Sequence, residues 1–212
     1  SYWCSMIQIN HILPLFPEVV GIYTTSTDSS KVLKILESSK WNVRNSGLGL
    51  QGDSRAYGGT SFNFFSKTPE LKKHSKQCVD HYIKEILKWK TNYRITNSWA
   101  TKVNPGGYAG THHHSNAWLS GVYYPVGDEN FKIRFYGSKH KQFQDTPTEY
   151  TINNSDTWNI PIVNNNTLII FNSLLNHEIL PNKSDKIRYS VAFNIFPKGF
   201  IGERGSDSSV QL

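Results

Sequence analysis

Three consecutive histidines, His112–His114, and a distant one, His177, are the side chains in this sequence best suited to hold a metal ion. In an extended chain His112 and His114 share one face and His113 points to the other. Two imidazoles spaced in this way can reach one metal ion. His177, which follows the apolar run TLIIFNSLLN, is the candidate third ligand. Alternation favours His114 over His113 as the second ligand without deciding between them. The alternative to a metal site is that the histidine run is an exposed turn that binds metal adventitiously.

A second pair of side chains could hold an anion. Arg188 and Ser190 stand two residues apart in KIRYSVAFNIF, so in a strand they lie on one face. A guanidinium stays charged and binds a carboxylate through two hydrogen bonds, and a hydroxyl can add a third. The alternative is a surface arginine on an edge strand, because the apolar neighbours Ile187, Val191 and Phe193 do not say which face Arg188 takes.

The N-terminal part of the chain predicts two helices that would support these groups. Asp28 is the expected N-cap of a helix in SSKVLKILESSKW, with one apolar face. Thr68 and Pro69 are expected to begin a second helix, whose lysines should face water. The apolar residues at helical spacing in this second helix are Leu71, Cys78, Tyr82, Ile86 and Trp89.

From about residue 92 the sequence predicts strands. Runs of β-branched and aromatic residues alternate with turn signals, a pattern typical of an antiparallel sandwich or barrel with helices packed on one face. The runs are YRITNSWATKV, AWLSGVYYPV, KIRFY, TWNIPI, TLIIF and IRYSVAFNIF. We expect the polar tail GERGSDSSVQL to fray.

Length and composition limit the class of protein. A chain of 212 residues with 37% hydrophobic residues suits one globular domain over residues 1–212. No apolar stretch approaches the roughly 20 residues of a membrane helix, and we expect no signal peptide at the start. Two cysteines exclude a disulfide scaffold and fit a reducing, cytoplasmic location. The net charge of +7 is compatible with nucleic acid, an acidic substrate or no specific partner.

Taken together, the motifs resemble the 2-oxoglutarate/Fe(II)-dependent oxygenase family, and within it the oxygenases related to prolyl hydroxylases. That family shows NSW, a Pro-Gly turn, His-x-His-Pro-Asn-Ser and Leu-Ser-Gly-Val-Tyr-Tyr, and later a His, Pro-Asn and Arg-x-Ser-x-Ser-Phe-Asn. The corresponding segments here are NSWATKVNPGGYAGTHHHSNAWLSGVYY and FNSLLNHEILPNKSDKIRYSVAFN. The resemblance extends over about residues 13–196.

The resemblance implies a mainly β fold: a double-stranded β-helix (jelly-roll) core over about residues 92–197, with two supporting N-terminal α-helices within about residues 24–91. It implies Fe(II), 2-oxoglutarate as cosubstrate and O2. The implied iron ligands are His112, His114 and His177. The implied 2-oxoglutarate contacts are Arg188, Ser190, Tyr124 and Asn104, and the alternative for Tyr124 is a core aromatic without a role in binding.

Two departures from the family pattern bear on the metal. Most members of the wider superfamily have a carboxylate where His114 stands, and the proline after the second histidine is Ser115 here. A neutral third ligand leaves more positive charge at the metal, so we expect weaker or less selective iron retention. Glu178 is a candidate partner for the His177 imidazole, with an exposed acid in a turn as the alternative.

The function predicted from this resemblance is a dioxygenase that hydroxylates a C–H bond of a peptide, an amino acid or a small metabolite. The alternatives are an oxygenase or demethylase of nucleic acid and a metal-binding, cupin-like module without oxygenase activity. Nucleic acid is the less favoured partner because the basic residues form no dense basic-aromatic stripe. Segments 46–63 and 137–150 are expected to flank the pocket mouth and select the substrate.

Overall fold

The computed structural model describes residues 11, 13, 15–39, 41–43, 53–56, 63–137, 149, 151–152 and 155–212. Its helical elements are α1 (Ser29–Glu37), the 3-10 turn η1 (Phe64–Ser66), α2 (Pro69–His81) and the π-helical turn η2 (Tyr82–Ile86). Its strands are β1 (Gly21–Thr24), β2 (Trp41–Val43), β3 (Asp53–Ala56), β4 (Asn92–Val103), β5 (Ala109–His112), β6 (Leu119–Tyr124), β7 (Lys132–Tyr136), β8 (Thr157–Pro161), β9 (Thr167–Asn172), β10 (His177–Ile179), β11 (Arg188–Lys198), β12 (Phe200–Ile201) and β13 (Val210–Gln211).

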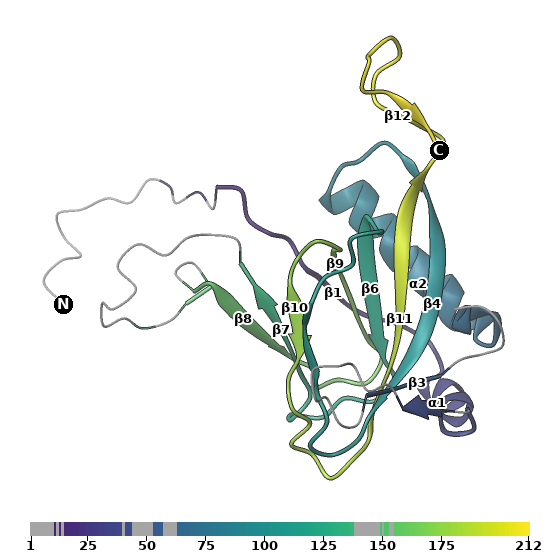
Figure 1. Cartoon of the computed structure of the whole chain (residues 1–212), viewed down its shortest axis with the longest axis vertical. Coiled ribbons are helices and arrows are strands. Elements are labelled where there is room, and N and C mark those ends of the chain that lie inside the picture. Colours follow the sequence, from purple (N-terminus) through teal and green to yellow (C-terminus); the bar gives the residue numbers. More distant parts are fainter. Residues whose placement is uncertain are drawn as a thin grey trace, which may run out of the picture.

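Two antiparallel sheets form the core of the fold. The larger sheet has the strand order β1-β9-β6-β11-β4-β3-β2, and the smaller one has the order β5-β10-β7-β8. Strands β1 to β4 lie in the larger sheet, and from β4 to β11 the chain passes repeatedly between the two sheets, with β7 and β8 adjacent in the smaller one. Helices α1 and α2 cover one side of the larger sheet (Figure 1). This arrangement confirms the predicted double-stranded β-helix with two supporting helices.

All six predicted strand runs form strands, as β4, β6, β7, β8, β9 and β11. The segment expected to be helical support also supplies three strands, β1, β2 and β3, that extend the larger sheet at both ends. These strands are only three or four residues long and carry little alternation that could reveal them. The single domain over residues 1–212 stays a prediction.

Both helices begin at the N-cap residues that the sequence predicts. The Asp28 carboxylate accepts hydrogen bonds from the backbone N–H groups of Ser30 and Lys31 at the start of α1. Thr68 occupies the N-cap position of α2, but its hydroxyl donates back to the Phe64 carbonyl instead of capping the helix. The apolar face predicted for α2 is wrong at Ile86, which is exposed, because the π-helical turn η2 changes the helical phase and Ile83 is the buried residue there.

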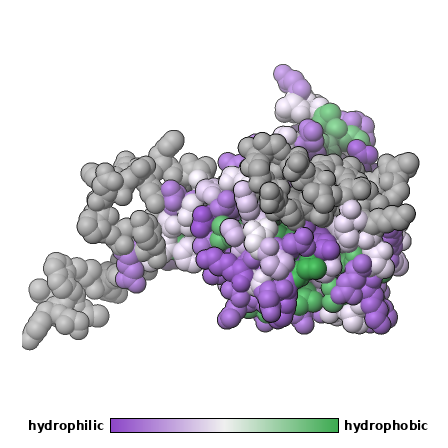
Figure 2. All heavy atoms as spheres, turned by 60° about the horizontal axis from the view of Figure 1, so that its bottom comes forward, coloured by the Kyte–Doolittle hydropathy of each residue, from purple (hydrophilic) through white to green (hydrophobic). Residues whose placement is uncertain are grey.

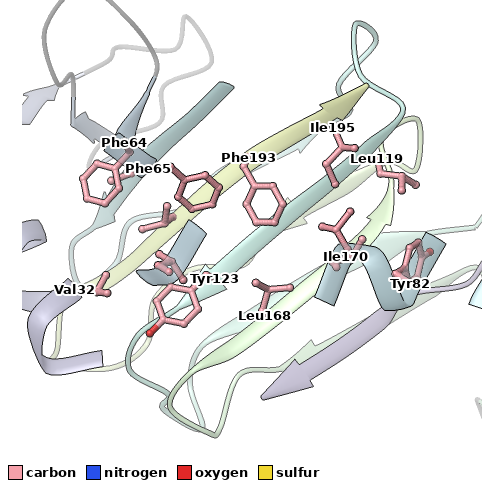
Figure 3. Packing of buried hydrophobic residues seen from close by; sticks show 14 of the residues in the cluster. Val32, Phe64, Phe65, Tyr82, Leu119, Tyr123, Leu168, Ile170, Phe193 and Ile195 are labelled. Carbon is pink, nitrogen blue, oxygen red and sulfur yellow. The ribbon is translucent and has the colours of Figure 1, made fainter. Parts of the chain in front are cut away.

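The two faces of the larger sheet have different surroundings. One face packs against the helices through a cluster of fully buried side chains that includes Leu36, Leu71, Tyr123 and Phe193. Figure 3 shows members of this cluster, among them Tyr123 and Phe193, gathered over the sheet. Gly121 lies beneath the Phe193 ring, where any Cβ atom would collide with the ring. The other face turns towards the smaller sheet and encloses a second apolar cluster together with a cavity that several polar side chains line.

Strand β4 contains an irregularity beside β11. Asn194 of β11 pairs with Asn97, but the next residue, Ile195, pairs with Ile95. Thr96 is therefore an extra residue in β4, which is the arrangement of a β-bulge.

The C-terminal tail forms an element that the sequence does not predict. Instead of fraying, it folds back so that β13 pairs with β12 in a hairpin that projects from the sheets (Figure 1). The described atoms on the face in Figure 2 are mostly hydrophilic, with separate hydrophobic areas. Among the described residues, no helix has the length and apolar character needed to cross a membrane. Cys4 and most of segments 46–63 and 137–150 lie outside the described residues.

Candidate metal centre

A tight turn between β4 and β5 positions the first histidine. The chain reverses at Gly106, which adopts a positive φ of 78°, a conformation that glycine tolerates without strain. The buried Asn182 holds this turn: its backbone carbonyl accepts from the Gly106 N–H, and its side-chain amide donates to the Val103 carbonyl. Strand β5 then ends at His112, which lies directly opposite His177 of β10.

The structure brings His112, His114 and His177 together. One ring nitrogen of each lies within 4.8 Å of those of the other two, an arrangement that could hold a metal ion. His113 is exposed and lies outside this cluster, with its Nδ1 3.2 Å from Asn176 Oδ1. The alternation of side chains along an extended chain therefore selects His114, and the choice that the sequence leaves open is made by geometry.

Hydrogen bonds set the orientation of the imidazoles. Nδ1 of His112 lies 2.7 Å from the Gly110 carbonyl, and Nδ1 of His177 lies 2.9 Å from the Leu175 carbonyl. A carbonyl oxygen only accepts, so Nδ1 of both rings carries the proton and Nε2 is the unprotonated nitrogen that binds metals.

The environment of His177 keeps its ring neutral. It is 4% exposed and packs against the Phe171 ring, with ring centroids 4.7 Å apart. Burial, reinforced by the neighbouring His112, lowers the pKa of His177 to about 3. A neutral imidazole is the form that a metal ion requires.

His114 is held differently. Its Nδ1 lies 2.8 Å from Asn194 Oδ1 and 2.9 Å from Ser120 Oγ, both of which are side-chain atoms. The Trp99 ring lies beside it, with the centroids 5.6 Å apart. Sequence reasoning does not single out Trp99, Ser120 or Asn194. A signal for Asn194 exists, since it continues the alternation of Arg188 and Ser190 along β11.

A cavity between the two sheets joins the histidines to the predicted anion-binding residues. Arg188, Ser190 and Tyr124 line the same cavity as the three histidines, and no described residue of its lining is an aspartate or glutamate. Arg188 is 2% exposed, so this face of β11 is the interior one. Its Nη1 donates to the Leu180 carbonyl at 3.4 Å, and its guanidinium lies 5.7 Å from the Phe131 ring centroid.

Tyr124 is fully enclosed at the same end of the cavity. Burial raises the pKa of Tyr124 to about 12, and the positive charge of Arg188 offsets part of that rise. The phenol therefore keeps its proton at neutral pH and is able to donate a hydrogen bond to an anion in the cavity.

Two other predicted residues lie away from the cavity. Asn104 is exposed in the turn after β4, where its backbone carbonyl accepts from the Gly107 N–H, and it does not line the cavity. Glu178 bonds to Arg134 and Tyr136 side chains on the outer side of the smaller sheet. Neither position supports the role that the sequence suggests for the residue.

The chain resembles known oxygenases in sequence and in fold. Residues 97–194 match the family model described as "Putative 2OG-Fe(II) oxygenase". No curated protein matches the chain in sequence.

Among solved structures, the non-heme alpha ketoglutarate dependent epimerase SnoN from nogalamycin biosynthesis has a TM-score of 0.63 at 10% identity, over 90% of this chain and 81% of that chain. HygX from Streptomyces hygroscopicus, solved with nickel and 2-oxoglutarate bound, has a TM-score of 0.57 at 9% identity, over 85% and 83% of the two chains.

A third similar structure is a prolyl hydroxylase from Trichoplax adhaerens in complex with a hypoxia inducible factor peptide fragment. Its TM-score is 0.58 at 14% identity, over 84% of this chain and 83% of that chain. At these low identities, the TM-scores show a shared fold alone. The family match spans all three clustered histidines, Arg188 and Ser190. The match over residues 97–194 and the shared fold support the 2-oxoglutarate and Fe(II)-dependent oxygenase family, whose members use Fe(II), 2-oxoglutarate and O2.

Proposed function

We propose that this protein is a dioxygenase that uses Fe(II) and 2-oxoglutarate to hydroxylate a C–H bond of a peptide, an amino acid or a small metabolite. The observation that carries the proposal is the convergence of three histidines and a buried arginine on one cavity. Each group alone has a structural explanation. Together, the histidines can bind a metal ion and the arginine can bind a dicarboxylate in the same cavity.

The three histidines hold the metal in this proposal. His112 and His177 present Nε2 because backbone carbonyls fix the proton on Nδ1. His114 supplies the third nitrogen. Bound there, iron and 2-oxoglutarate together supply the oxidising chemistry, which protein side chains lack.

Arg188, Ser190 and Tyr124 bind the cosubstrate in this proposal. The guanidinium receives the carboxylate farther from the metal, and the Ser190 and Tyr124 hydroxyls donate to its oxygens. These groups lie in a largely apolar enclosure, so water competes poorly and each charged hydrogen bond is stronger. A contact from Asn104 stays a prediction, without support from its exposed position.

The absence of a carboxylate among the clustered ligands has an electrostatic consequence. Three neutral imidazoles leave the charge of a divalent ion uncompensated by the protein. We therefore expect weaker or less selective iron retention than at a site with two histidines and a carboxylate.

Two observations weigh against the alternatives. A metal-binding module without oxygenase activity has no need for a buried arginine in the cavity that the three histidines line. For nucleic acid, lysines in α2 and after η2 already pair with carboxylates, such as Lys76 with Asp80 and Lys88 with Glu85. Salt-dependent binding of DNA or RNA would restore that alternative.

The decisive experiment is anaerobic addition of Fe(II) and 2-oxoglutarate, followed by visible absorption. We expect a metal-to-ligand charge-transfer band in the wild type and its loss in His112→Ala, His114→Ala and His177→Ala. His113→Ala is the matched control from the same histidine run and should retain the band. A band that is absent in the wild type, or that persists in His112→Ala, would overturn the site.

Hydroxylation is tested separately from cofactor binding. Adding O2 should convert 2-oxoglutarate to succinate, and a candidate substrate should gain the mass of one oxygen atom. If the product has the same number of oxygen atoms as the substrate, the assignment to the oxygenase family stands. The reaction is then an oxidation other than hydroxylation. The cytoplasmic location inferred from the two cysteines stays a prediction.

A further inference from the structure

The three clustered histidines differ in what holds their Nδ1 atoms. Backbone carbonyls hold His112 and His177, and no side-chain substitution removes a carbonyl. Side chains hold His114, through Asn194 Oδ1 and Ser120 Oγ. His114 is therefore the one member of the cluster whose proton position depends on side-chain identity.

The surrounding polar groups form one connected network. Ser120 Oγ lies 2.9 Å from Asn194 Oδ1, and it lies 2.9 Å from Ser173 Oγ on its other side. Ser120 and Ser173 are 1% and 0% exposed, so water does not compete for these hydrogen bonds. A network shielded in this way is costly to leave incompletely bonded.

Counting donors assigns the proton of His114. The Ser120 hydroxyl donates to Asn194 Oδ1, so it is free to accept from the Ser173 hydroxyl, although either hydroxyl of that pair is able to donate. The amide oxygen has a second lone pair, which accepts from His114 Nδ1–H. In the competing arrangement Ser120 donates to His114 Nδ1, which moves the ring proton to Nε2 and prevents Nε2 from binding a metal.

We propose that Asn194, supported by Ser120 and Ser173, is a positioning residue that fixes the metal-binding tautomer of His114. The inference rests on the proposed function, since it assumes that His114 is a metal ligand. Asn194 lies on the same face of β11 as Arg188 and Ser190, so one strand face anchors the cosubstrate and sets the third ligand. The amide performs this role without adding charge. An acid at residue 194 would add a negative charge beside a ligand set that has none.

The direct test is ring-nitrogen NMR of the metal-free full chain at a pH where the histidines are neutral. We expect the Nδ1–H tautomer at all three clustered histidines in the wild type. In Asn194→Leu, His114 alone should shift towards the Nε2–H tautomer, which free histidine prefers. His112 and His177 serve as internal controls. An Nε2–H tautomer at His114 in the wild type would overturn the proposal.

Metal binding gives the second readout, with Co(II) as the probe and its visible absorption as the signal. We expect Asn194→Leu to weaken Co(II) binding roughly 10- to 100-fold. Asn194→Asp, which keeps the acceptor, should bind Co(II) at least as tightly as the wild type. Asn176→Leu is the matched control, because it removes the same kind of Asn–His contact from His113, outside the cluster.

The outcomes separate this inference from the proposed function. If the wild type itself fails to bind Co(II) at the three histidines, the proposed function fails. If the wild type binds and Asn194→Leu binds equally well, only the positioning role fails. Should Asn194→Leu not fold, Ser120→Ala provides the test: a several-fold loss of Co(II) affinity supports the network, and unchanged affinity overturns it.

Discussion

The two faces of β11 differ in function, and alternate residues of the strand point to each face. Val191, Phe193 and Ile195 point to the helices and are fully buried among apolar side chains. On the other face, Arg188 and Ser190 line the cavity, and Asn194 Oδ1 lies 2.8 Å from Nδ1 of His114. The apolar face requires volume and hydrophobicity, which many side chains supply. The cavity face requires particular atoms at particular places.

This contrast predicts that substitutions on the two faces fail in different ways. Core-face changes should lower the free energy of unfolding and leave the ligand affinity of the folded protein intact. Cavity-face changes should lower the ligand affinity of the protein that folds.

The largest stability effect is expected for Phe193→Ala. The ring is 0% exposed and packs against Phe65, with centroids 5.2 Å apart. Removing it should lower the free energy of unfolding by about 3–5 kcal/mol, measured by urea denaturation. Metal affinity of the folded fraction should not change. A large loss of metal affinity in folded Phe193→Ala would break the division between the faces.

Arg188→Leu should show the opposite pattern. Loss of the guanidinium should weaken 2-oxoglutarate binding roughly 10- to 150-fold, the equivalent of about 1.5–3 kcal/mol for a charged hydrogen bond. Calorimetric titration and the KM for 2-oxoglutarate measure this loss. Arg134→Leu is the matched control, since Arg134 pairs with Glu178 on the outer side of the smaller sheet. Equal effects of the two variants would contradict the anchor role of Arg188.

Gly121→Ala tests how tightly the core face is packed. A Cβ atom at residue 121 would collide with the Phe193 ring, which must move to admit it. Overpacking of this kind should cost about 1–3 kcal/mol of stability, measured as a lower midpoint of thermal or urea unfolding. Unchanged stability would mean that the Phe193 ring has room to shift.

Asp28→Ala should give the smallest effect, because the cap of α1 is exposed. A hydrogen bond from Ser30 and others from the helix N-terminus lower the pKa of Asp28 from 3.8 to about 2. The carboxylate therefore stabilises the fold fully above pH 3.8, and this stabilisation is lost as the pH falls towards 2. Unfolding midpoints of the wild type and Asp28→Ala should converge over that range. Asp28→Asn, which keeps a cap acceptor, should show a small loss and no such pH dependence.

The sequence predicts long elements and short motifs better than it predicts short elements. Strand β7 agrees with its run, KIRFY, and both helices begin at their predicted caps. The strand β3 and the C-terminal hairpin are too short for a periodic signal, since pairing with neighbours creates them.

For the site, the sequence predicts which types of side chain could meet, and the fold decides which do. His114 and His113 are indistinguishable by type, and the structure selects His114 through its place on the cavity side. Asn104 is exposed in the turn after β4, so its contact with 2-oxoglutarate stays a prediction from the motif alone. Ser120 and Asn194 come from strands far apart in the chain, so only the β6–β11 pairing makes them neighbours.

The extra residue at Thr96 changes the parity of β4. Ile95 packs with the helix-side cluster, and strict alternation from Ile95 would place Trp99 on that same side. Because the bulge inserts one residue, Trp99 lines the cavity instead. Before Thr96, the odd-numbered residues of β4 point to the helix-side core. After Thr96, they point to the cavity. Deleting Thr96 would restore a single phase to the strand, and either Ile95 or Trp99 would then lie on the wrong side of the sheet.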